Sequence, residues 1–527
     1  MKNNYFFLLI IITLLLVMPM LLMLHGLFPR LDTDYDSNLP IYYFLTDYIR
    51  AHHTLPFSIP YVGTGISVLG DPLSAVLNPL FMLPLLLFGI EGGLKIVFLL
   101  LFLLSAITMW IFLSSLSLQK EIRLWGSLLY TFSGAFVARI AAGHIEKFLS
   151  YPLIPLFFLL AIKEDVTLVR CIGLAGIFTV ILFSGDWYTV WFLSIFLVVV
   201  ETYYFFTLTH RRTQRVLVFV LTYAFFIILS SPKLIPYLLF VRPHYARYYS
   251  IDPFLGSVHF FLEPLAFIMP FQAAFYDRPF LQRHVGFHYN WYEYYAFISP
   301  LPLLFLVKLK HLLSDQRVRL FLLLIFVSSL YLALKYPYSP FHWLFIFLHP
   351  LQEIRVPQRI IMPTTALVIA LLALCAGYYL KTCRSGKTCL LVYACLLASF
   401  LWTYAVTFQT LRHSYAPINK EAQSTIARLR QKDHTKFYVA TFVPGLQVFL
   451  MQEKIYVFNY YYGWRPDKEP SFLSKDEKSV NFSLLRRIRP KYIITIRKDN
   501  LTAYNYKPFL RNITLTVWKT DTATVKP

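Results

Sequence analysis

Three carboxylates stand close together directly after the first apolar run of the chain. They are Asp32, Asp34 and Asp36, in the stretch LDTDYDSN at 31–38. Charged side chains are rare beside a bilayer unless they are paired or perform chemistry. One such carboxylate is suited to act as a general base, and the three together are suited to hold Mg²⁺ or Mn²⁺. The alternative is a solvated loop in which Asp36 or Ser37 caps the following helix. The stretch alone leaves this choice open.

Two arginines lie four residues apart at the start of a later apolar segment, in the stretch QEIRVPQRII. Arg355 and Arg359 have the spacing that puts two side chains on one helix face. Pro357 is typical of a first helical turn, which would leave Arg355 just outside the helix. Guanidinium groups bind phosphate oxygens in pairs of hydrogen bonds. The arginines therefore indicate either a phosphate site or side chains that reach to lipid headgroups.

Other polar residues lie at the predicted ends of apolar segments. They are His144, Glu146 and Lys147 in AGHIEKF, Asp186 in SGDWY, and His288 and Glu293 in HYNWYEYYAF. Short hairpin loops and a belt of interfacial aromatic residues explain them about as well as a substrate site does. Acids, histidines and arginines nevertheless gather on the same predicted side of the membrane, so we retain all but Lys147 as candidates that contact or support a substrate.

The composition is that of a membrane protein. Of 527 residues, 57% are hydrophobic and only 14% are charged, with a mean hydropathy of +0.56. Apolar stretches long enough to span a bilayer predict about eleven transmembrane helices. They begin near residues 5, 94, 123, 146, 167, 188, 216, 291, 318, 359 and 388. The first is long for a signal peptide and lacks a cleavage site, so we expect it to be retained.

Five basic loops fall at every second connection between these predicted spans. They are LQKEIR, KEDVTLVR, THRRTQR, VKLKHLLSDQRVR and KTCRSGKTC. Because short cytoplasmic loops are enriched in Lys and Arg, this pattern predicts a cytoplasmic N-terminus and a C-terminal region outside the plasma or inner membrane. The five cysteines show no disulfide or metal-binding spacing.

The predicted outer side carries most of the remaining structure. A transmembrane domain at 1–411 has outer loops at 29–93 and 241–290, and a small α/β domain follows at 412–527. The first loop contains an amphipathic helix in LPIYYFLTDYIRAHH. It also contains a short apolar stretch at 77–90, which we expect to be re-entrant or interfacial rather than spanning.

The C-terminal region has a helical pattern in NKEAQSTIARLRQK. Strand patterns follow in KFYVATFV, KIYVFNYY, PKYIITIR and ITLTVWK. From residue 412 onward, 21 Lys and Arg stand against 9 Asp and Glu. The stretch FNYYYGWRP adds aromatic residues. These features predict either packing against the membrane face or docking of an anionic acceptor.

Several motifs together resemble integral-membrane glycosyltransferases of the GT-C superfamily. They are the outer Asp residues followed by HTLPFSIPYVGTGISVLGDPLSAVLNPL, then LLYTFSGAFVARIAAGHIEKFLSYPLIPL, WYEYYAFISPLPLLFL, IRVPQRIIMPTTALVIALLAL and IRPKYIIT. The last four resemble the bacterial branch that decorates wall polymers such as lipoteichoic acid. The similarity extends over most of the chain.

This resemblance implies a fold and a reaction. A sugar would pass from a polyprenyl-phosphate donor to an acceptor, glycan or anionic, on the outer side, with inversion at the anomeric carbon. Asp34 is the first candidate for the base and Asp36 the second, and Arg355 and Arg359 correspond to the basic groups near the donor phosphate. Three acids stand where the family offers one, so the base is not fixed. A divalent cation is not required by the resemblance.

Two other classes remain open from the sequence. One is a ligase or polymerase of lipid-linked polymers, and the other is a transporter or flippase, which predicts charged residues within spans. Lys233, in SSPKLIP, is the main candidate for such a residue. No glycine-rich phosphate loop followed by Lys is present, so no motif indicates a cytosolic nucleotide substrate.

Overall fold

The computed structural model forms two compact units. One, the helical unit, comprises 1–25, 95–232 and 249–414, and the other, the mixed unit, comprises 26–94, 233–248 and 415–527. The structure describes residues 4–23, 27–29, 34–59, 66–208, 212–241, 267–268, 295–334, 357–383, 385–413, 415–417, 420–434, 438–441, 450, 453, 455–457, 492–496, 506–511 and 515–520.

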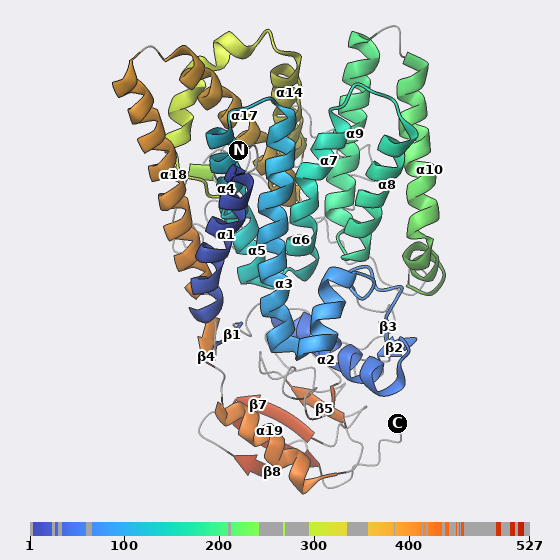
Figure 1. Cartoon of the computed structure of the whole chain (residues 1–527). Helices are drawn as coiled ribbons and strands as arrows, with labels where there is room; N and C mark the ends of the chain where they lie inside the picture. Colours follow the sequence, from blue (N-terminus) through green and yellow to red (C-terminus); the bar gives the residue numbers. More distant parts are fainter. Residues whose placement is uncertain are drawn as a thin grey trace. The chain divides into compact units, whose positions relative to one another are not determined.

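The helical unit is built from apolar helices, to which α3 and α10 contribute in part (Figure 1). Their bounds are α1 Asn4–Met23, α3 Pro79–Ser115, α4 Lys120–Thr131, α5 Gly134–Ala142, α6 Ile145–Ser150, η1 Tyr151–Leu153, α7 Ile154–Ala161, α8 Leu168–Phe183, α9 Trp187–Thr207, α10 Arg212–Pro236, η6 Leu301–Leu312, α14 Gln316–Leu334, η7 Pro357–Ile360, α17 Ile361–Thr382 and α18 Gly386–His413. Among the described residues, six of these are long and apolar enough to cross a membrane: α1, α3, α9, α10, α17 and α18. The chain is therefore a multi-pass membrane protein.

Two of the other predicted spans are interrupted. The span expected near residue 123 consists of α4 and α5, which are separated at Phe132 and Ser133. The span expected near residue 146 consists of α6, η1 and α7. Pro152 and Pro155 stand in the first turns of η1 and α7. Proline lacks the N–H that an interior turn needs, so it suits these starts and divides the segment.

The core of the helical unit is centred on α17. In its most apolar stretch, 89% of the residues are buried, and the helix packs against η6, α14 and α4. By contrast, α1 exposes large apolar side chains such as Phe7, Leu15 and Leu22. A helix that is apolar on all sides and still exposed is expected to face lipid.

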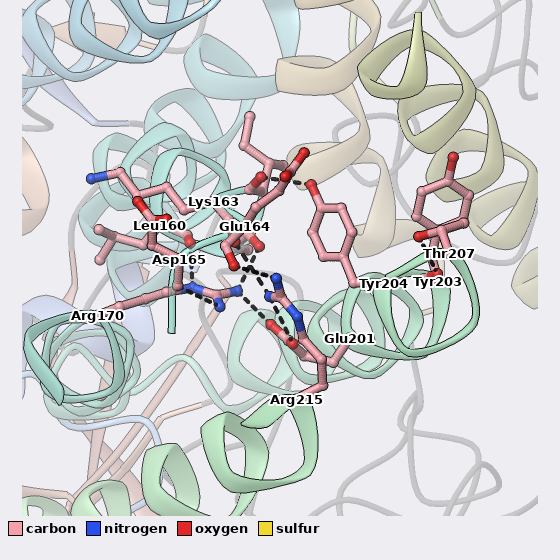
Figure 2. A network of polar contacts seen from close by, with 12 residues as sticks. Leu160, Lys163, Glu164, Asp165, Arg170, Glu201, Tyr203, Tyr204, Thr207 and Arg215 are labelled. Carbon is pink, nitrogen blue, oxygen red and sulfur yellow. Dashed lines mark hydrogen bonds and ion pairs between the residues drawn. The ribbon is translucent and has the colours of Figure 1, made fainter. Parts of the chain in front are cut away.

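A buried charged network joins four helices at one end of this unit (Figure 2). Arg170 of α8 and Arg215 of α10 both pair with the carboxylate of Glu201 on α9. The two guanidinium groups also donate to backbone carbonyls of Leu160, Ala161, Lys163, Glu164 and Asp165. The Tyr204 hydroxyl donates to Ile162 O at 2.6 Å. The last carbonyls of a helix have no partner within it, and the network supplies donors to them and to the α7–α8 turn.

The mixed unit contains the first predicted outer loop and the C-terminal region. Its elements are β1 Leu27–Pro29, α2 Tyr35–His52, β2 Ser58–Ile59, β3 Ile66–Ser67, the start of α3, the end of α10, the π-helical turn η3 Tyr237–Val241, β4 Tyr415–Pro417, α19 Lys420–Lys432, β5 Tyr438–Thr441, β6 Tyr456–Val457, β7 Tyr492–Ile496, β8 Tyr506–Arg511 and β9 Leu515–Thr520. β5 to β9 form a mixed sheet in the order β6-β5-β7-β9-β8. β5 is parallel to β6 and β7, and β9 is antiparallel to β7 and β8.

Helix α19 packs on one face of this sheet (Figure 1). Ile426 and Leu429 of α19 are buried against Tyr492 and Val517 of the strands. The Tyr492 hydroxyl donates to Asp433 Oδ2 at 2.8 Å. Burial, together with this hydrogen bond and the negative charge of Asp433, raises the pKa of Tyr492 above its ordinary value. The helix and four strands lie where the sequence predicts them.

Strand β8 was not expected from the sequence. It is an edge strand that contains Pro508, and its register shifts between Pro508 and Leu510. Proline cannot donate to a ladder and is therefore tolerated at sheet edges and bulges. A proline beside basic residues looks like a loop in sequence, and only the pairing with β9 makes it a strand.

The predicted amphipathic helix of the first loop is α2. Ile41 and Leu45 are buried, whereas Asp47 and Arg50 are exposed, as the spacing predicts. The expected capping by Asp36 or Ser37 is wrong, because both lie inside the helix. The N-cap residue is Asp34, whose backbone is already helical and whose side chain makes no capping hydrogen bond.

The predicted short apolar helix at 77–90 is the first part of α3. The helix begins at Pro79 and is broken at Gly89, whose φ of 74° lies in the left-handed region that favours glycine. Asn78 Oδ1 accepts from Leu80 N at 2.9 Å at its start. The Arg50 guanidinium donates to Leu86 O at 2.6 Å and to Leu85 O at 3.2 Å. It thus satisfies carbonyls in the turn that precedes the break.

Candidate functional site

Asp34 stands at the N-terminus of α2 in the mixed unit. Its side chain is half-buried and takes no part in capping. The helix is fixed to the turn before α3, where Ala75 N donates to the Tyr42 hydroxyl at 2.9 Å. Asp34 therefore stands at the start of an anchored helix, and its role as a general base remains a prediction.

A second set of charged residues meets in the helical unit. We call Glu146, Lys147, Asp186, Tyr188 and Arg359 the Tyr188 cluster; they come from α6, the α8–α9 turn, α9 and η7. All are buried or nearly so. The members are distant in sequence and come together only in the fold.

Two tight turns position the first members. Gly143 ends α5 in the left-handed conformation with φ 79°, and α6 begins two residues later. Glu146 and Lys147 consequently lie in the first turns of α6. Gly185 has φ 87°, and Asp186 after it is the N-cap of α9, accepting a hydrogen bond from Thr189 N at 3.0 Å. Both turns depend on a backbone conformation that glycine adopts readily.

Lys147 and Asp186 form an ion pair that is fully removed from solvent. The Lys147 ammonium donates to Asp186 Oδ1, and both side chains have 0% exposure. Taking two charges out of water is costly unless they pair closely. Removal of either partner is therefore expected to leave an uncompensated buried charge.

Arg359 and Lys147 both contact the ring of Tyr188. The Arg359 guanidinium carbon lies 4.8 Å from the ring centroid and the Lys147 amine 4.6 Å from it. Cations within about 6 Å of a ring centroid are attracted by its negative face. Arg359 Nη1 is 3.9 Å from Glu146 Oε1, a distance of charge attraction rather than a hydrogen bond.

Arg139 and His144 link α5 to α6 beside the cluster. Both are buried, and Arg139 Nη1 lies 3.5 Å from His144 Nδ1. A guanidinium group only donates, so Nδ1 is the acceptor in this contact.

The structure brings together Glu146, Asp186 and Arg359, which the sequence had placed at separate helix ends. It adds Lys147 and Tyr188, which we had not selected, although both stand in the quoted stretches AGHIEKF and SGDWY. Asp32, Arg355, His288 and Glu293 lie outside the described residues, as does the side chain of Asp36. Their predicted roles remain predictions.

Within the described ranges, no three His, Cys, Asp or Glu side chains are placed to hold a metal ion. The acids proposed for a cation are Asp32, Asp34 and Asp36, and only the Asp34 side chain belongs to those ranges. The metal hypothesis for LDTDYDSN therefore stays a prediction.

The fold is similar to that of known glycosyltransferases. ArnT from Cupriavidus metallidurans bound to undecaprenyl phosphate matches with a TM-score of 0.54 and 12% identity, over 98% of both chains. The arabinofuranosyltransferase AftD from Mycobacteria matches with a TM-score of 0.58 and 11% identity, over 99% of this chain and 40% of that one. The apo form of ArnT gives a TM-score of 0.50.

No protein-family model and no curated protein sequence matches the chain. At these identities the structural matches establish a GT-C-like fold. They do not by themselves establish an activity, because one fold supports many functions.

Proposed function

We propose that this protein is a membrane glycosyltransferase that moves a sugar from a polyprenyl-phosphate donor to an acceptor on the outer side of the cell membrane. The observation that carries the proposal is the Tyr188 cluster, in which the cations of Lys147, which is buried, and Arg359, which is 12% exposed, lie against one ring. The likeness in fold to ArnT, one structure of which holds undecaprenyl phosphate, supports this choice of donor.

The donor phosphate is held by Arg359, with Arg355 as a second predicted contact. The Arg359 guanidinium group is 3.9 Å from the Glu146 carboxylate, which is too far for a hydrogen bond. A phosphate oxygen could therefore take the place of that carboxylate and bind the guanidinium group directly. Lys147 is already paired with Asp186, so the charge of its ammonium group is largely compensated there. As the bond to phosphate breaks, Arg359 offsets the charge that grows on the departing lipid phosphate.

The acceptor is activated by a carboxylate of the first outer loop. Asp34 is our choice and Asp36 the second. The base takes the proton of the acceptor hydroxyl, the acceptor oxygen bonds to the anomeric carbon, and the bond from that carbon to the phosphate oxygen breaks. Attack opposite the departing phosphate inverts the anomeric centre. Polyprenyl phosphate is released with both electrons of the broken bond.

We also propose the orientation that the basic loops predict. The N-terminus lies in the cytoplasm, about eleven segments cross the membrane, and the region from 412 onward lies outside. A wall polymer is the proposed acceptor, because that region carries many more basic than acidic residues.

The first test is binding of undecaprenyl phosphate to the purified protein in lipid nanodiscs. We expect Arg359→Ala to weaken binding by roughly 10- to 100-fold, since a hydrogen bond to a charged group contributes about 1.5–3 kcal/mol. Arg212→Ala is the matched control, because Arg212 also lies over an aromatic ring, at 5.4 Å from the Phe205 centroid. Unchanged affinity of the Arg359→Ala, Lys147→Met double variant would exclude this phosphate site.

A further inference from the structure

The two carboxylate oxygens of Asp186 differ in their hydrogen bonds within the described residues. Oδ1 accepts from the Lys147 ammonium and from Thr189 N. Oδ2 is buried and has no hydrogen-bond partner in the described part of the chain. The whole side chain has 0% exposure. Helix capping and the ion pair both use Oδ1, so neither explains the second oxygen.

An orphaned carboxylate oxygen is costly to bury. Leaving a buried acceptor unpaired costs about 1–3 kcal/mol, and more for a charged group. Most buried side-chain polar atoms in folded proteins have a partner, which is either protein or ordered water. An unpaired one at a site with other charged residues is therefore a place where a bound molecule is expected to donate.

The charges around Asp186 Oδ2 limit which chemical group of a bound molecule can lie there. An ionised carboxylate only accepts, so its partner must present an O–H or N–H group. An anion is excluded at Oδ2 by charge. A divalent cation is disfavoured by the adjacent Lys147 ammonium, and no third ligating residue lies near among the described residues. A hydroxyl group is the donor that a sugar carries in several copies.

We propose that Asp186 Oδ2 accepts a hydrogen bond from a hydroxyl group of the sugar carried by the donor lipid. This rests on the proposed function and assigns a sugar contact to the Tyr188 cluster, beside the cations proposed for the phosphate. A site built around one hydrogen-bonding hydroxyl strongly rejects the analogue that lacks it. Asp186 thereby selects which sugar is transferred.

The test compares two kinds of lipid on the same protein. Bare undecaprenyl phosphate and undecaprenyl phosphate bearing glucose, galactose, mannose, N-acetylglucosamine or arabinose are titrated against the full chain in nanodiscs. The measured quantity is the ratio of the two affinities, which a general weakening of the site does not change. We expect at least one sugar-bearing lipid to bind the unsubstituted protein roughly 10-fold or more tightly than the bare lipid.

Asp186→Asn is the informative variant. It keeps one oxygen for Lys147 and Thr189 and replaces the other oxygen by an NH₂ group, which cannot accept. The affinity ratio should fall to near one, even if both lipids bind somewhat more weakly. With deoxy analogues of the preferred sugar, one position should matter for the unsubstituted protein and lose its effect in Asp186→Asn.

Three results would overturn the inference. One is an affinity ratio in Asp186→Asn equal to that of the unsubstituted protein. Another is an unsubstituted protein that binds every sugar-bearing lipid no better than the bare one. In both cases binding of the bare lipid, and its loss in Arg359→Ala, would leave the proposed phosphate site intact. Failure of the unsubstituted protein to bind any of these lipids would instead remove the proposed function and this inference with it.

Discussion

Tyr188 is the residue on which the two cations of the cluster converge. Lys147 and Arg359 come from different elements and would repel each other in a dry site. The negative faces of the ring attract both. The ring thereby contacts both cations, while their counter-charges are the carboxylates of Asp186 and Glu146.

Two substitutions of Tyr188 distinguish the contribution of its ring from that of its hydroxyl group. Tyr188→Phe keeps the cation contacts and should leave undecaprenyl phosphate affinity within about twofold. Tyr188→Leu removes them, and affinity should fall roughly 3- to 30-fold, since each contact contributes about 0.5–2 kcal/mol. Phe206→Leu, an exposed position on the same helix, is the control. Equal losses in the Phe and Leu variants would assign the effect to the hydroxyl group instead.

Asp34 is tested by a change of one atom. Asp34→Asn keeps the shape of the side chain and removes its basicity. Transfer from the donor lipid should fall about 100-fold or more, in line with the loss of a general base, while undecaprenyl phosphate binding is retained. Asp36→Asn should have a smaller effect. Normal transfer by Asp34→Asn would show that the base lies elsewhere.

At the scale of residues, the sequence indicates which carboxylates and arginines are candidates for the site. It does not indicate which residues they contact. Glu146, Asp186 and Arg359 stand out because they are charged residues directly beside long apolar segments. Tyr188 does not, because an aromatic residue at the start of a span is typical of an interfacial belt. Its partners are distant in sequence, so no local spacing reports the contact. The unpaired Oδ2 of Asp186 likewise depends on the whole surroundings.

At the scale of elements, the network of Arg170, Glu201 and Arg215 determines how α7 to α10 meet at one end (Figure 2). In the sequence, its two arginines end the basic loops KEDVTLVR and THRRTQR, which predict only the orientation of the chain in the membrane. In the structure, Arg170 and Arg215 instead pair with Glu201 on α9. Hydropathy does not separate an arginine that faces headgroups from one that pairs with a buried glutamate and donates to the carbonyls of a turn.

Removal of Glu201 should leave two buried guanidinium groups without their shared counter-charge. Breaking a buried ion pair on one side costs about 3–5 kcal/mol, so Glu201→Ala should lower the free energy of unfolding by about that amount. Thermal unfolding of the purified protein in detergent measures the change. Asp47→Ala, at an exposed carboxylate outside the network, should stay within about 0.5 kcal/mol of the unsubstituted protein. A Glu201→Ala variant as stable as Asp47→Ala would mean that the network contributes nothing.

At the scale of the whole molecule, hydropathy alone predicted a multi-pass membrane protein, and the structure confirms that class. The likeness to ArnT and AftD at 12% and 11% identity shows how little of the sequence this fold requires. Apolar surface of the right length is enough to specify a span. The short helices α4 to α7 were harder to predict, because their ends are set by particular turns and prolines.

Orientation is tested by labelling from one side of the membrane. In a background with all five cysteines replaced by serine, a membrane-impermeant maleimide added outside intact cells should label Ser414→Cys. It should not label Ser385→Cys until the membrane is made permeable. The reverse pattern would place the C-terminal region in the cytoplasm and rule out a reaction on the outer side.

The break at Gly89 has a consequence for the match between protein and bilayer. As one uninterrupted rod, the 37 residues of α3 would be about 55 Å long at 1.5 Å per residue. The hydrocarbon layer is only about 30 Å thick, and a rod of that length would have to tilt steeply or thicken the layer around it. With the break, the part from Ile90 to Ser115 is about 39 Å long, which a modest tilt accommodates. One glycine with positive φ thus adjusts an overlong apolar segment to the thickness of the membrane that it crosses.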